Sequence, residues 1–124
     1  EALNWYAQAF DQSKGPATRL QWGAGYLQAL VDLAPGDARR IEATAQKLFD
    51  EAARDSGAFY QRSASSMRRV GRTLTAWNQD GSRSASIQRL QARLAPLCNK
   101  VEKAGERQAT CRGLLTDAAA KRAG

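Results

Sequence analysis

Clusters of glycine, proline and aspartate divide this 124-residue chain into six segments, each with apolar residues at helical spacing. The breaks fall at Gly15-Pro16, Pro35-Gly36-Asp37, Asp55-Ser56-Gly57, Asp80-Gly81-Ser82 and Gly105. Alanine, leucine, glutamine and arginine dominate, and runs of β-branched residues are missing, which favours helices over strands. The sequence therefore predicts an all-α fold with helices over 2–13, 16–34, 38–54, 58–79, 84–104 and 106–122.

Short turns between these helices predict one compact bundle, because helices joined in this way tend to pack as antiparallel hairpins. Segment 16–34 is apolar around most of its circumference and is expected to be central, with Gly23 and Gly25 at close helix contacts. Pro96 is expected to kink or split segment 84–104. The predicted core consists of large apolar side chains: Trp5, Phe10, Trp22, Tyr26, Leu27, Leu30, Leu48, Tyr60, Leu74, Trp77, Leu90 and Leu94.

The whole range 1–124 has the usual size of a single domain. No stretch approaches the ~18 uninterrupted apolar residues of a transmembrane helix, so no membrane span is predicted. The chain starts at Glu1 without an initiator methionine and leads at once into an apparent helix. We therefore expect a helical domain cut from a longer chain.

Two cysteines, Cys98 and Cys111, lie at similar distances from the turn predicted between the last two helices. If those helices form a hairpin, the two side chains meet and can form a disulfide bond, which implies an oxidising compartment. Such a bond would close a loop of about fourteen residues and stabilise the fold by about 3 kcal/mol in the chain-entropy model.

Other states of the two cysteines stay open at this level. Cys98 and Cys111 could also be two buried free thiols of a protein in a reducing compartment. A redox-active pair is less favoured, because no close Cys-x-x-Cys spacing is present to lower a thiol pKa. A zinc site is disfavoured, since two cysteines without any histidine leave half of the usual ligands missing. We predict no metal and no cofactor.

The net charge of +7 is concentrated in the second half of the chain. Residues 1–60 hold six basic and eight acidic side chains, a balance of −2, whereas residues 61–124 hold thirteen basic and four acidic ones, a balance of +9. Such asymmetry can mark a surface for nucleic acid or anionic lipid, or only arginines that solvate outer helix faces. The candidate basic surface consists of Arg62, Arg68, Arg69, Arg72, Arg89 and Arg93.

The absence of histidine excludes nucleophile pairs of the Ser-His and Cys-His kinds. Base catalysis would fall to carboxylates, and Asp50 and Glu51 are typical of solvated positions near a helix end. The glycines at 23 and 25 are followed by no lysine and indicate no phosphate-binding loop. No catalytic residue is predicted, and an enzymatic role for this domain alone is the least favoured.

Several stretches resemble the helical region that follows the thioredoxin domain in exported bacterial, and in particular proteobacterial, thioredoxin-family proteins. They cover most of the chain and are Lys14-Gly15-Pro16-Ala17-Thr18-Arg19-Leu20-Gln21-Trp22-Gly23-Ala24-Gly25-Tyr26, Leu30-Val31-Asp32-Leu33-Ala34-Pro35-Gly36-Asp37, Tyr60-Gln61-Arg62, Ala76-Trp77-Asn78 and Cys98…Cys111. The resemblance implies a structural disulfide and a periplasmic location. The thioredoxin Cys-x-x-Cys motif is absent, so any thiol–disulfide oxidoreductase activity would belong to the rest of the parent chain.

We therefore predict a non-catalytic helical accessory or interaction domain of an extracytoplasmic thioredoxin-like thiol–disulfide protein. Its expected partner is an upstream thioredoxin-like domain or another protein. The alternative, from a different class, is a basic helical module that binds nucleic acid through residues 61–122. That alternative is less favoured because of the nearby aromatic residues, Tyr60 and Trp77. Both fall on the apolar face of segment 58–79, so they are expected in the core and would not stack on bases.

Overall fold

The computed structural model describes residues 2–54, 61–99 and 106–115, and within these ranges the chain forms six helices and no strand. They are α1 (Ala2–Gln12), α2 (Pro16–Leu33), α3 (Ala38–Ala53), α4 (Gln61–Trp77), α5 (Ser84–Cys98) and α6 (Glu106–Gly113). The predicted all-α fold is confirmed for this part of the chain. The first three helices agree with the predicted limits to within one residue at each end.

Local signals explain where these helices begin. Gly15 has a φ of 87°, a conformation that suits glycine, and Pro16 then opens α2 at a position where its missing N–H is no loss. The side chain of Asp37 accepts a hydrogen bond from the backbone N–H of Arg40 and caps the start of α3. Between α4 and α5, Gly81 has a φ of 80° and makes a tight turn.

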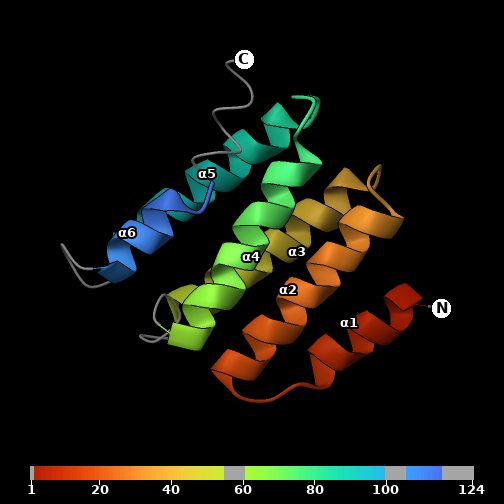
Figure 1. Cartoon of the computed structure of the whole chain (residues 1–124), viewed down its shortest axis with the longest axis horizontal. Helices are drawn as coiled ribbons and strands as arrows, with labels where there is room; N and C mark the ends of the chain where they lie inside the picture. Colours follow the sequence, from red (N-terminus) through yellow and green to blue (C-terminus); the bar gives the residue numbers. More distant parts are fainter. Residues whose placement is uncertain (1, 55–60, 100–105, 116–124) are drawn as a thin grey trace.

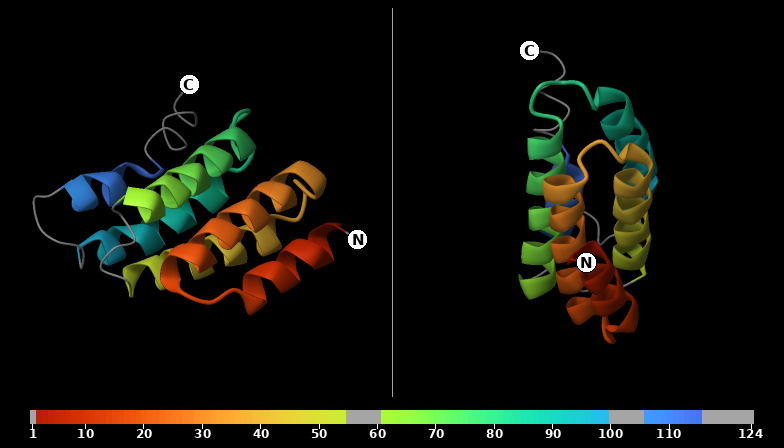
Figure 2. Two further views of the ribbon diagram at one scale, coloured as in Figure 1. Left: turned by 60° about the horizontal axis from the view of Figure 1, so that its bottom comes forward. Right: turned by 90° about the vertical axis from the view of Figure 1, so that its right-hand side faces the viewer.

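The helices form two layers, which are seen edge-on in the right-hand view of Figure 2. One layer contains α2 and α4, and the other contains α3 and α5, while α1 packs against α2 and α6 packs against α5 and α4 (Figure 1). The main neighbour of α4 is thus α2, which is two helices earlier in the chain. Helix α2 contacts α1, α3 and α4, which confirms its predicted central position.

The core lies between the two layers and contains most of the predicted residues. Phe10, Tyr26, Leu27, Leu30, Leu48, Leu74, Trp77, Leu90 and Leu94 are all buried. Trp22 is only partly buried, at the edge of the core. The prediction for Trp5 is wrong, because its side chain is 57% exposed. Residues two positions apart on a helix point to nearly opposite sides, so Trp5 faces away when Leu3 packs against the core. Tyr60 lies outside the described residues.

The C-terminal helices are shorter than the sequence pattern predicts. Helix α5 passes through Pro96 without a break and ends at Cys98, only two residues further on. The predicted split at this proline is therefore wrong. A proline disturbs the turn that precedes it, and here the rest of the helix is too short to be displaced far. The parts of the predicted helices at 100–104 and 116–122 lie outside the described residues.

Candidate functional site

The two cysteines form a disulfide bond that joins the end of α5 to α6. The Cα atoms of Cys98 and Cys111 are 5.6 Å apart, and the residues are 1% and 0% exposed. The predicted bond is confirmed, and the alternative of two free thiols is excluded in this structure. Because thiol–disulfide exchange needs a thiolate to reach one of the sulfurs, a buried bond of this kind is suited to a structural role.

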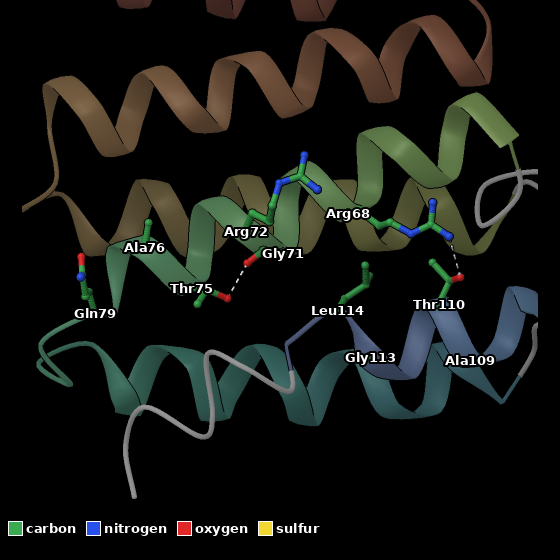
Figure 3. Close-up of a pocket in the computed structure, with 10 residues that line it drawn as sticks. All are labelled: Arg68, Gly71, Arg72, Thr75, Ala76, Gln79, Ala109, Thr110, Gly113 and Leu114. Carbon is green, nitrogen blue, oxygen red and sulfur yellow. Dashed lines mark hydrogen bonds between the residues drawn. The ribbon is translucent and has the colours of Figure 1, made fainter. Parts of the chain in front are cut away.

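The disulfide ties α6 to α5, and α6 and α4 form the walls of an open groove of about 600 Å³. Its lining residues include Arg68, Arg72 and Thr75 from α4 and Gln79 from the turn after α4. Ala109, Thr110 and Leu114 line it from α6 and the turn after α6 (Figure 3). No carboxylate is among the described residues that line this groove. The groove therefore combines two arginine side chains with hydroxyls and small apolar side chains.

A glycine sets how closely the two walls approach. A Cβ atom built on Gly71 of α4 would overlap the backbone carbonyl of Leu114, which cannot move aside as a side chain can. Gly71 is not among the residues predicted from the sequence, although an isolated glycine inside an amphipathic helix is a signal for close packing. Gly23 behaves as predicted, because a Cβ there would overlap the buried Leu48 side chain, whereas Gly25 has only ordinary contacts.

Three of the predicted basic residues lie exposed on α4. Arg68 donates a hydrogen bond across the groove to the hydroxyl of Thr110, with an N–O distance of 3.4 Å, and Arg72 lies one turn further along α4. Figure 3 shows the guanidinium of Arg72 on the side of α4 turned away from α6. Arg69 lies toward α2, where its guanidinium is near Gly25. None of the three has an ion pair with a carboxylate in the described part of the chain. The side chain of Arg62 lies outside the described residues.

The remaining two predicted basic residues are held elsewhere, in ion pairs that link α5 to α3. Arg89 donates two hydrogen bonds to the carboxylate of Glu42, and Arg93 donates two to the carboxylate of Asp50. The guanidinium of Arg89 lowers the pKa of the Glu42 carboxyl group. The structure therefore does not bring Arg89 and Arg93 together with the arginines of the groove.

Helix α3 contributes to every ion pair in the described part of the chain. The four pairs are Arg19–Glu51, Asp11–Lys47, Arg89–Glu42 and Arg93–Asp50. The Arg19–Glu51 pair is the most enclosed of the four. Arg19 also donates hydrogen bonds to the backbone carbonyls of Phe10 and Ser13 at the end of α1. Hydrogen bonds from Arg19 lower the pKa of Glu51. These carboxylates serve helix packing and are not placed as a catalytic pair.

An exposed aromatic pair lies on another part of the molecule. Trp5 of α1 contacts Trp22 of α2 edge to face, with ring centroids 5.5 Å apart. Helix α1 lies on the far side of the bundle from α6, so this pair does not adjoin the groove (Figure 1). The described arginines of the groove therefore have no exposed aromatic ring between them.

Among the residues that the structure describes, no group of three or more histidine, cysteine, aspartate or glutamate side chains is placed to hold a metal ion. No described helix combines the length and the apolar character that crossing a membrane requires.

Comparisons with protein-family models, with curated proteins and with solved structures found no match to this chain. The resemblance to thioredoxin-family proteins thus stays a prediction from the residues quoted above.

Proposed function

We propose that this chain is a non-catalytic helical interaction domain that works in an extracytoplasmic compartment and binds a protein partner in the groove between α4 and α6. The observation that carries the proposal is the buried disulfide beside this groove. It ties the eight-residue α6, which is too short to be stable alone, to the rest of the fold. Disulfides of this kind persist in oxidising compartments such as the bacterial periplasm.

The resemblance makes a thioredoxin-like domain or protein the first partner to test. In this proposal the redox chemistry belongs to that partner, and the helical domain supplies a docking surface. The buried position of Cys98 and Cys111 supports this division, because neither sulfur is open to an incoming thiolate.

The nucleic-acid alternative is less well supported by the geometry. Arg89 and Arg93 already neutralise carboxylates of α3, which leaves the exposed arginines of α4 as the main described basic group. Proteins that bind single strands usually add aromatic platforms to such a group, and none is described beside these arginines.

Site-specific photo-crosslinking in cells of the source organism tests the proposal. A photoreactive amino acid at Ala76, which is exposed and lines the groove, should give an adduct with a protein. The same amino acid at Ala92, which is exposed on α5 outside the groove, is the matched control and should give none. The absence of any protein adduct at Ala76 would refute the groove as a docking site.

The compartment is tested separately by intact mass after alkylation without reduction. Protein taken from its own cells should carry no alkyl group on either cysteine. Alkylation of both Cys98 and Cys111 would place the chain in a reducing compartment and overturn the extracytoplasmic part of the proposal.

A further inference from the structure

We infer that the groove between α4 and α6, together with the exposed face of α4 that borders it, takes an acidic segment of the partner protein, whose carboxylates pair with Arg68 and Arg72. This inference rests on the proposed function and names the chemistry of the partner. Guanidinium groups present planar donors that match a carboxylate in two parallel hydrogen bonds.

Charge complementarity carries the inference. Helix α4 contains Arg62, Arg68, Arg69 and Arg72 and no acidic residue. The acidic side chains of α3 are occupied by arginines of α2 and α5. The carboxylate that follows the groove in sequence, Asp80, accepts hydrogen bonds from Ser82. No described carboxylate therefore forms an ion pair with Arg68 or Arg72, and an acidic segment of a partner would supply the complementary charge.

The spacing of the arginines and the lining of the groove suit a peptide. Arg68 and Arg72 are one helical turn apart, which places their backbones about 6 Å from each other along the axis. From Arg68 to Ala76 the α4 wall extends about 12 Å, which is the length of about two helical turns. Ala76 adds apolar surface to the α4 wall, and Ala109 and Leu114 add it to the opposite wall. A segment with carboxylates at one end and apolar residues beyond them would match both features.

Binding of purified oxidised protein to a defined probe tests this inference. The probe is a fluorescein-labelled helical peptide of alanine, leucine and glutamate, about fourteen residues long, with glutamates four positions apart. Fluorescence anisotropy should show that it binds at least about tenfold more tightly than the same peptide with glutamine in place of glutamate. Oligodeoxythymidylate and phosphatidylglycerol vesicles are the competing anionic probes.

Variants of the protein locate the binding. R68E/R72E should weaken binding of the glutamate peptide by about tenfold or more, and R39E/R54E, the same charge change on exposed residues at the two ends of α3, should leave it unchanged. A109E adds a negative charge to the other wall without removing an arginine and should also weaken binding. Thermal unfolding of each variant shows that its fold is kept.

Three results would overturn the inference. Equal affinity for the glutamate and glutamine peptides would show that carboxylates are not recognised. Loss of peptide binding in R39E/R54E to the same extent as in R68E/R72E would show that only net charge matters. Tighter binding of oligodeoxythymidylate or of the vesicles at Arg68 and Arg72 would assign the groove to another class of ligand. Suppose that one of these results is obtained while the photoreactive amino acid in place of Ala76 still crosslinks to a protein in cells. Then only the inference about an acidic segment fails, and the proposed docking function stands.

Discussion

Removal of the disulfide should cost this fold a large part of its stability, and the cost can be divided into two terms. Cys98 and Cys111 are separated by 13 positions in sequence. A bridge over a loop of this size stabilises a protein by about 3 kcal/mol in the chain-entropy model, because it restricts the unfolded chain. The double substitution C98A/C111A also deletes two buried sulfur atoms, and each deletion should cost about 1 kcal/mol, as for a buried methylene group.

Urea unfolding, followed by far-ultraviolet circular dichroism, separates these terms in three samples. Oxidised protein should be more stable than chemically reduced protein by about 3 kcal/mol. Reduced protein should in turn be more stable than C98A/C111A by about 2 kcal/mol, since it keeps both sulfur atoms in the core. A difference between the oxidised and reduced samples below about 1 kcal/mol would refute the reasoning, because the bond would then add little to a loop already ordered in the unfolded chain.

The remaining predictions concern packing, pH and exposure. Gly71→Ala should lower the free energy of unfolding by about 1–3 kcal/mol because its methyl group meets the Leu114 carbonyl, whereas Gly113→Ala, with open space around it, should be neutral or stabilising in the same urea assay. Glu51 has a lowered pKa in the folded protein, so its contribution is present above its ordinary pKa of 4.5 and is lost as the pH falls through the lower folded value. Glu51→Gln should therefore cost about 1–2 kcal/mol at pH 7 and reduce the loss of stability between pH 5 and pH 3; an unchanged acid dependence would contradict this. Trp5→Ala should change stability by less than about 1 kcal/mol, and a larger loss in thermal unfolding would place this side chain in the core.

Features that depend on neighbouring residues could be predicted from the sequence. The start of α2 follows from Gly15 and Pro16, and the start of α3 follows from the cap that Asp37 provides. The disulfide also follows from local information, because Cys98 and Cys111 belong to consecutive helices on either side of one turn.

Features that depend on distant residues could not be predicted in this way. Gly71 and Leu114 meet only because α6 packs beside α4, and no pattern within either helix states that pairing. Arg89 reads as a free surface charge in sequence, yet it pairs with Glu42, which is 47 positions away. Trp5 belongs to the predicted core because it is large and apolar. It lies outside the apolar stripe of α1, which consists of Leu3, Tyr6, Ala7 and Phe10.

The groove depends on both neighbouring and distant residues. Its arginines lie at helical spacing in one segment and were selected from the sequence, but the wall opposite them was not. An i, i+4 pair of arginines has the same pattern on a solvated face and beside a groove. Only the tertiary contact between α4 and α6 distinguishes the two cases.

The concentration of ion pairs on α3 gives the molecule an uneven electric field. Acidic groups of α3 compensate the arginines of α5, while no described carboxylate forms an ion pair with the arginines of α4 in the opposite layer. Among the described helices, α4 therefore has the largest net positive charge, +4 from four arginines. Long-range attraction would favour approach to a negatively charged surface with α4 foremost. On a cation-exchange resin, α4 should accordingly be the favoured contact.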